Sequence, residues 1–242
     1  MNHFTLNYKP LGAYALLIEW PNKIDPSILD EIISLQASIE SELGDVITET
    51  VNAYNSLTII FKEEAISIMV LKERVSQIHS LGITQKQTKK KTWKIPVCYD
   101  EGFGIDLKEI ANEKKCSVKD IIDMHTGPRY LVYFTGFLPG FLYLGGLPTT
   151  LVIPRKSSPR LQIIKGAVAI GGQQTGIYPA ESPGGWNIIG NSPLEFFNPA
   201  QDPPCFSKAG DYLKFYAIDS MAHQKIKEEV EAGKFEIESE SE

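Results

Sequence analysis

The sequence is poor in cysteine and in long apolar runs, and each shortage excludes a class of protein. Its three cysteines are odd in number and widely spaced, which fits neither a disulfide framework nor a set of zinc ligands. No apolar run approaches the roughly 20 residues that cross a bilayer. The first residues also lack the basic and apolar regions of a secretory signal. We therefore expect a cytoplasmic protein with no membrane partner.

Several nucleotide-binding and catalytic signatures are missing as well. The chain has no G-x-x-x-x-G-K-[ST] motif, so it has no recognisable ATP site of the P-loop kind, and it has neither H-E-x-x-H nor G-x-S-x-G. It holds four histidines, and His125 alone lies near the unusual motifs described below, so we predict no metal site and no Ser-His-Asp triad. The net charge of −6 argues against a nucleic-acid partner, because affinity for phosphates comes from clustered Lys and Arg.

Residues 1–85 are predicted to form an α/β domain. Short apolar runs of strand length at 13–19, 46–54 and 57–61 alternate with two amphipathic helical patterns. The first helix should begin after the N-cap Asp25, with Pro26 in its first turn, because both residue types favour helix starts. The order β-α-β-β-α predicts two helices packed on one sheet. The polar, basic segment 86–92 is interpreted as a linker.

Residues 93–220 are predicted to form a second, β-rich domain. After a strand near 95–99 and two short helices, most of the chain's glycines and prolines gather between 136 and 204. Short β-rich runs lie between these breakers, 194–197 among them, and such a pattern is typical of a closed β-barrel or sandwich. Residues 221–242 are predicted to be a C-terminal helix followed by an acidic tail that frays.

The segment 136–143 interleaves aromatic residues with glycine and proline. Phe137, Phe141 and Tyr143 would present flat apolar faces at rigid corners, where they could exclude water from a substrate. The alternative is a barrel corner that these rings fill. The sequence alone leaves both open.

Two Pro-Arg dipeptides follow, five residues apart. Arg155 and Arg160 lie on a proline-stiffened segment and could together hold a carboxylate or phosphate, since a guanidinium matches two oxygens. Ordinary surface salt bridges are the alternative.

Two glycine-rich motifs complete the candidate binding residues. In the first, Gln174 and Thr175 stand beside glycines that let backbone approach a ligand closely, and they could hydrogen-bond an amide. In the second, Gly184 and Gly185 precede the large side chain of Trp186.

His125 is the one credible general acid or base in the chain. Its imidazole could titrate near neutral pH. The alternative is a histidine that stabilises the C-terminal end of a helix just before a Thr-Gly-Pro segment.

Taken in order, these motifs resemble one protein family. His125 with Thr126, then G-F-x-P-G-F-x-Y, P-R-x-x-x-P-R, Q-T-G-I-Y-P and S-P-G-G-W are similar to the motif series of the family that comprises an inhibitor of a sporulation histidine kinase, 5-oxoprolinase B subunits and allophanate hydrolase subunit 1. The chain departs from the family at Ala13 and Asn52, both in the N-terminal domain. These departures count more against a kinase contact there than against a site in the barrel.

The resemblance implies an α+β two-domain protein, with a ferredoxin-like N-terminal domain followed by a cyclophilin-like β-barrel. It also implies a role as the B subunit of an ATP-dependent 5-oxoprolinase, which hydrolyses 5-oxo-L-proline to L-glutamate. The partners would be a larger carboxyltransferase-like protein of the C type and a protein of the A type. The complex would use ATP, and this chain would hold no metal and no biotin attachment site. An inhibitor of a histidine kinase and half of a urea carboxylase or allophanate hydrolase carboxyltransferase are the alternatives.

Overall fold

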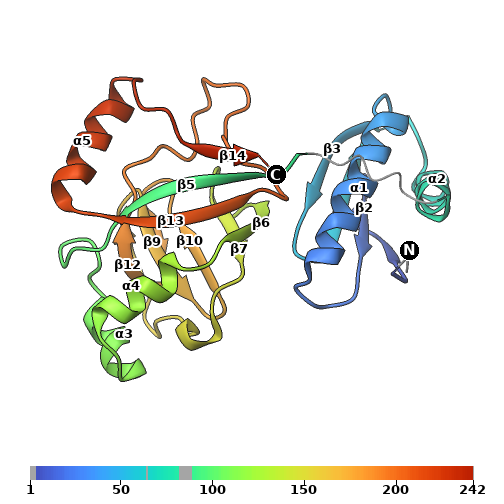
Figure 1. Ribbon diagram of the computed structural model, residues 1–242. Coiled ribbons are helices and arrows are strands. Elements are labelled where there is room, and N and C mark those ends of the chain that lie inside the picture. Colours follow the sequence, from blue (N-terminus) through green and yellow to red (C-terminus); the bar gives the residue numbers. More distant parts are fainter. Residues whose placement is uncertain (1–3, 64, 82–88, 242) are drawn as a thin grey trace. The chain divides into compact units, whose positions relative to one another are not determined.

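The structure is a computed structural model that describes residues 4–63, 65–81 and 89–241. The protein is of the α+β type, and its chain divides into two compact units, residues 1–88 and 89–242, each with its own apolar core (Figure 1).

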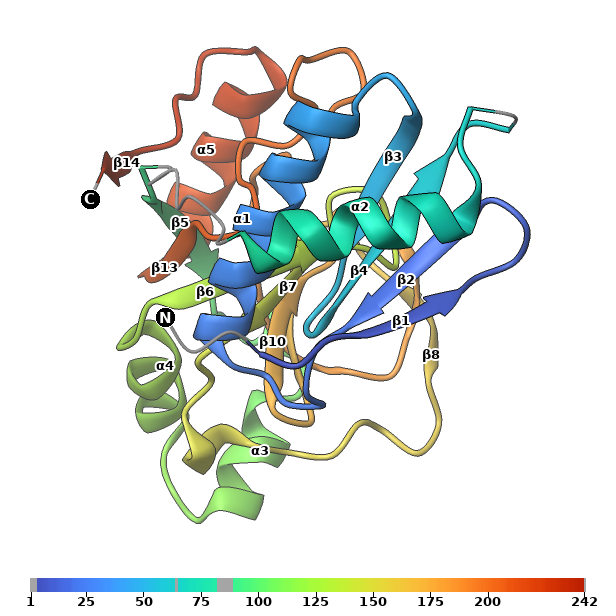
Figure 2. The same cartoon turned by 90° about the vertical axis from the view of Figure 1, so that its right-hand side faces the viewer.

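The first unit contains an antiparallel sheet in the strand order β1-β2-β4-β3 and two helices that share one core with it (Figure 2). Its elements are β1 (Asn7–Pro10), β2 (Ala15–Glu19), α1 (Pro26–Leu43), β3 (Ile47–Asn52), β4 (Ser56–Phe61) and α2 (Ile68–Ser80). Strand β1 was not predicted, because it is short and largely exposed and so lacks the alternation that marks a half-buried strand.

Helix α1 forms as its sequence predicts. The Asp25 carboxylate caps it by accepting a hydrogen bond from the Ser27 backbone N–H at 2.9 Å, and Pro26 is its first residue. One face is buried against the sheet. The apolar residues on that face are Ile28, Leu29, Ile32, Leu35, Ile39 and Leu43.

The second unit is built around a β-barrel. Among the described residues its elements are β5 (Lys91–Cys98), α3 (Leu107–Lys114), α4 (Val118–Thr126), β6 (Tyr130–Thr135), β7 (Leu142–Gly145), the 3-10 turn η1 (Thr149–Leu151), β8 (Arg160–Ile163), β9 (Ala167–Gly171), β10 (Gln174–Ile177), β11 (Ser182–Gly184), β12 (Asn187–Asn191), β13 (Tyr212–Ile218), α5 (Ser220–Glu231) and β14 (Ser239–Ser241). A capping box between Ser117 and Asp120 begins α4.

The barrel closes through the order β12-β9-β10-β7-β6-β13-β5, since β12 also pairs with β5 at Asn191 and Cys98. Residues 92–98 of β5 pair in parallel with the whole of β13. Helices α3 and α4 contribute buried residues to the same core as these strands (Figure 1). The closed barrel fits the cyclophilin-like architecture that the sequence predicts for this part of the chain.

Three sequence expectations fail in the second unit. Segment 194–197 is not a strand; prolines flank it at 193 and 199, although Leu194 and Phe196 are buried. The predicted linker 86–92 ends too late, because Lys91 and Thr92 belong to β5, while its residues 86–88 lie outside the described residues.

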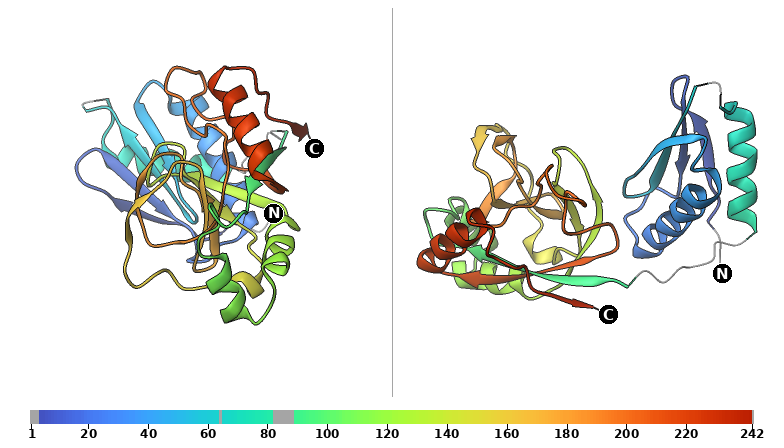
Figure 3. Two further views of the ribbon diagram at one scale, coloured as in Figure 1. Left: turned by 90° about the vertical axis from the view of Figure 1, so that its left-hand side faces the viewer. Right: turned by 90° about the horizontal axis from the view of Figure 1, so that it is seen from above.

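The third concerns the acidic tail, which we expected to fray. Its residues 239–241 instead form β14, which pairs with residues 91–93 of β5 (Figure 3). The Lys94 ammonium binds the carboxylates of Glu238 at 3.3 Å and Glu240 at 3.0 Å, and these ion pairs hold the acidic tail against β5.

Candidate functional site

The aromatic and arginine motifs of the sequence meet in one place, around Trp186. We call this group the Trp186 cluster. Its members are Phe137, Phe141, Tyr143, Arg155, Tyr178 and Trp186. They come from the corner before β7 and from β7 itself, from the segment before β8 and from the residues on either side of β11.

Phe141 is the centre of the aromatic part of this cluster. Its ring is 2% exposed, and four rings surround it at centroid distances of 5.1 to 5.6 Å. Phe137, by contrast, is 62% exposed and has a positive φ of 64°. The Phe141 ring therefore fills the corner, as one of the two alternatives predicts, whereas the Phe137 ring faces solvent.

Two glycines allow the Trp186 ring to lie flat on the barrel wall. A Cβ atom at Gly171 would come within 2.6 Å of the indole, and one at Gly176 would lie 3.0 Å from the Phe141 ring and 3.2 Å from the indole. No larger residue fits at Gly171 without displacing the indole.

Arg155 and Arg160 have different surroundings. The exposed Arg155 guanidinium lies 5.6 Å from the centre of the Trp186 ring, a cation–π arrangement. Arg160 turns instead to the buried Asp106 and donates from Nη2 to Oδ1 at 2.7 Å. Its Nη1 is buried without a hydrogen-bond partner in the structure, so it retains a donor for a ligand oxygen.

Asp106 is the hub of a small ion-pair network. It is 3% exposed, and besides Arg160 it binds the Lys156 ammonium at 3.2 Å and accepts the Ile188 N–H at 2.6 Å. The network adjoins the Trp186 cluster, because the Lys156 N–H donates to the Gly185 carbonyl at 2.7 Å. A buried carboxylate with two cationic partners holds both cations in place.

Tyr178 supplies a hydroxyl next to these cations. A Cβ at Gly184 would come within 2.3 Å of its oxygen. Burial raises the pKa of Tyr178, while the hydrogen bond from the Trp186 backbone N–H and the charges of Arg155 and Arg160 act in the opposite direction. The phenol therefore stays protonated at neutral pH and can donate a hydrogen bond.

His125 and Thr175 lie away from this cluster, inside the core. His125 is fully buried, its ring stacks on Phe215 at 4.6 Å, and its two nitrogens bind the hydroxyls of Tyr99 at 2.8 Å and Thr175 at 2.9 Å. The Thr175 hydroxyl donates to the Ala169 carbonyl, so it accepts from the imidazole, which places the proton on Nε2. With both nitrogens bound, the ring is held in the core rather than presented to a substrate.

We expect this burial to make stability depend on pH. Burial lowers the pKa of His125 to about 3, whereas an unfolded chain restores an ordinary value of about 6.5. Between these two values the unfolded chain binds a proton that the folded protein does not. The stability that the protein owes to a neutral His125 is therefore fully present above pH 6.5. As the pH falls towards 3, the free energy of unfolding decreases by up to about 1.4 kcal/mol per pH unit.

Urea titrations between pH 7 and pH 4.5 measure this loss. The fall in the free energy of unfolding should be smaller in a His125→Gln variant than in the parent protein. Equal slopes for the two proteins would show that His125 does not remain neutral in the folded state.

The structure thus gathers seven of the predicted residues and separates Thr175 and His125 from them. Phe137, Phe141, Tyr143, Arg155, Gly184, Gly185 and Trp186 lie together, and Arg160 joins them through the Asp106 network. The partly exposed Gln174 lies at the start of β10, and Thr175 and His125 are in the core. Sequence reasoning missed Asp106, Lys156 and Tyr178; of these, Lys156 and Tyr178 fall within quoted motifs, but only spatial proximity gives them a role.

The described parts of the chain contain neither a metal-ligand cluster nor a membrane-spanning helix. No group of three or more His, Cys, Asp or Glu side chains there could hold a metal ion. In the same residues, no helix is both long enough and apolar enough to cross a membrane.

Comparison with known proteins places this chain in a family. Residues 6–207 match the family described as carboxyltransferase domain, subdomain C and D. The chain belongs to this family. Its relatives include the 5-oxoprolinase B subunit of Bacillus subtilis, 36% identical over 90% of this chain and 95% of the relative, and the 5-oxoprolinase B subunit of Haemophilus influenzae, 36% identical over 87% and 97%.

Solved structures show the same fold within longer chains. The structure of TTHA0988 is 29% identical and superposes with a TM-score of 0.75 over 85% of this chain and 40% of that chain. The urea amidolyase of Kluyveromyces lactis, at 20% identity, has a TM-score of 0.82 over 99% of this chain and 16% of that chain. This chain therefore spans less than half the length of these two solved proteins.

Proposed function

We propose that this chain is the B subunit of an ATP-dependent 5-oxoprolinase and acts with partner proteins in the cytoplasm to hydrolyse 5-oxo-L-proline to L-glutamate. The observation that carries the proposal is the 36% identity to the 5-oxoprolinase B subunit of Bacillus subtilis across nearly the full length of both chains. The relatives from Bacillus subtilis and Haemophilus influenzae are both named as 5-oxoprolinase B subunits, which favours this role over that of a kinase inhibitor or of part of a urea carboxylase.

Within that complex, the Trp186 cluster would bind the substrate or its activated form. Arg155 and the free Nη1 of Arg160 would hold a carboxylate or phosphate, and the Tyr178 hydroxyl could donate to the same group. Phe137 and Tyr143 would exclude water, and Gln174 could reach an amide. ATP would bind to the assembled complex, whose other members would be a larger C-type protein and an A-type protein. His125 and Thr175 are left out of this surface because both are fully buried.

The N-terminal unit supports a ferredoxin-like assignment by its strand order. The sheet has the order β1-β2-β4-β3. Along the chain, β2, α1, β3, β4 and α2 follow one another in the order in which a ferredoxin-like fold connects its first three strands and two helices. Strand β1 takes the edge position beside β2 that the strand after the second helix takes in that fold. We propose this class for the unit on the basis of topology alone.

Reconstitution tests the proposed function. The isolated chain should form no L-glutamate from 5-oxo-L-proline and ATP, and the A-type and C-type partners without it should form little. All three together should be active. Robust turnover by the isolated chain would contradict a non-autonomous role, and no gain on adding this chain to its partners would contradict the function itself.

The arginines can be tested in the reconstituted complex. Arg155→Ala or Arg160→Ala should lower kcat/KM about tenfold or more, because each removes a charge-assisted hydrogen bond worth roughly 1.5–3 kcal/mol. Lys108→Ala is the control, since it removes another cation of the same unit, 68% exposed and paired with Glu101. Parental rates in both arginine variants would show that the two are ordinary surface charges.

A further inference from the structure

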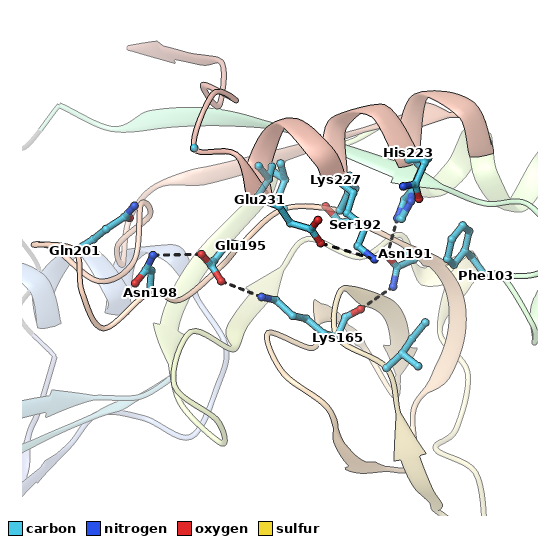
Figure 4. Close-up of a pocket in the computed structure, with 16 residues that line it drawn as sticks. Phe103, Lys165, Asn191, Ser192, Glu195, Asn198, Gln201, His223, Lys227 and Glu231 are labelled. Atoms are coloured by element: carbon cyan, nitrogen blue, oxygen red, sulfur yellow. Dashed lines mark hydrogen bonds and ion pairs between the residues drawn. The ribbon is translucent and has the colours of Figure 1, made fainter.

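A cavity lies in the second unit, and its lining shares no residue with the Trp186 cluster. Its volume is about 830 Å³, within the range of small-molecule sites (Figure 4). One wall is α5, and the opposite wall is formed by residues 191–201 and by the turn at 164–165.

The floor of the cavity is fixed by a chain of hydrogen bonds. His223 on α5 binds the Asn191 Oδ1 through Nε2 at 2.8 Å, and the Asn191 amide donates to the Lys165 carbonyl at 2.9 Å (Figure 4). The His223 ring also packs on Phe103 at a centroid distance of 4.4 Å. Asn191 and His223 are both buried, so this floor is part of the folded core rather than a mobile surface.

The charged residues of the lining balance one another. Two lysines and two glutamates form one ion pair on each wall, Lys165 with Glu195 at 2.9 Å and Lys227 with Glu231 at 3.9 Å. A lining with no net charge disfavours a polyanion such as a nucleotide triphosphate. It suits a ligand that carries one positive and one negative group, because each group can meet a side chain of the opposite sign.

Donors for a carboxylate converge near the floor. The Lys227 side chain extends from α5 into the cavity, towards Asn191 (Figure 4). Its ammonium is close enough to His223 to add to the effect of burial, which is the main cause of the lowered pKa of that imidazole. Ser192, which follows Asn191 in the chain, is 2% exposed, and its hydroxyl has no hydrogen-bond partner in the structure. Buried hydroxyls are normally bonded, so Ser192 has an unmet capacity for a ligand oxygen.

Part of the remaining lining is apolar, beside the polar side chains of Asn198, Gln201 and Gln224. Phe103, Ile164, Leu194 and Val230 line the cavity and offer contacts to a hydrocarbon or aromatic side chain. The ion pair between Lys227 and Glu231 is long, at 3.9 Å, and both side chains are more than half exposed. Breaking this pair so that each side chain can bind a ligand therefore costs little free energy.

We propose that this cavity binds a free α-amino acid as its zwitterion, with the carboxylate on Lys227 and Ser192 and the ammonium on Glu231 or Glu195. The amino-acid side chain lies along the apolar wall. This site is separate from the proposed substrate cluster, and the inference does not rest on the proposed function.

Binding to the purified chain tests the proposal directly. L-leucine, L-glutamine and L-phenylalanine are titrated at millimolar concentrations and followed by ligand-observed NMR and calorimetry. At least one should bind, and Lys227→Met should weaken it about tenfold or more, because a charge-assisted hydrogen bond is lost. The matched control is Lys225→Met, which removes a lysine of the same helix with a near-identical pair to Glu229 at 3.8 Å but outside the cavity lining.

Two analogues of whichever amino acid binds most tightly separate a zwitterion site from a simpler one. The analogue without the ammonium and the amide without the carboxylate (4-methylpentanoate and L-leucinamide in the case of leucine) should both bind about tenfold more weakly than that amino acid. The proposal is overturned if none of the three amino acids binds, if either analogue binds as tightly as its parent amino acid, or if Lys227→Met binds as well as Lys225→Met.

Discussion

Replacing Phe141 by alanine should lower the free energy of unfolding by about 3–5 kcal/mol, a large part of the stability of a typical domain. The ring is 2% exposed and lies between four other aromatic rings, so its removal leaves a cavity that these neighbours cannot readily fill. Urea unfolding of the isolated chain measures the loss without any partner protein.

Phe137→Ala is the matched control for this prediction. It deletes the same ring four residues away, from a side chain that is 62% exposed, and its effect should stay below about 1 kcal/mol. Similar losses for both variants would mean that Phe141 is not the buried centre of the corner. If Phe137 instead contributes to a partner or substrate surface, its truncation should reduce activity of the complex while leaving the melting temperature unchanged.

The second large effect is expected at Asp106. Asp106→Ala should cost about 3–5 kcal/mol, because it removes the carboxylate between two cations and leaves Arg160 partly buried without a counter-charge. It also leaves the Ile188 N–H without its acceptor. The free energy of unfolding from urea titration gives the magnitude.

Glu109→Ala provides the comparison, since its carboxylate also binds the Lys156 ammonium, at 2.6 Å, but is 66% exposed. A surface pair of this kind contributes about 0–1 kcal/mol. If the two variants are equally stable, Asp106 is only a surface partner of Lys156. Asp106→Asn should fall between them, because an amide oxygen can still accept from Ile188 but carries no charge.

Local features of the fold could be predicted from the sequence, and long-range ones could not. Helix α1 was predicted from its N-cap and spacing because those signals act within a few residues of one another. The closure of the barrel depends on Asn191 meeting Cys98, and no local pattern specifies that pairing. Strand β14 was missed for the same reason, since an acidic tail has no apolar alternation and gains its structure from β5.

The candidate site shows the same division. The sequence identified Trp186, Phe141 and Arg155 through unusual motifs, and the structure brings them into contact. It could not show that Arg160 faces Asp106, which lies 54 residues earlier in a segment without any motif. His125 attracted attention as a titratable residue in a motif, but burial is a property of the whole fold, and it makes this histidine a neutral part of the core.

The pairing of β14 with the start of β5 has an evolutionary consequence. Residues 91–93, where the chain enters the second unit, pair with residues 239–241 near the other end of that unit. Modules whose ends are neighbours can be joined into longer polypeptides without rearranging their interior. Other domains could therefore be joined to the second unit at these neighbouring ends. Gene fusion and fission would need to alter only the connecting segments, and the barrel would remain the same.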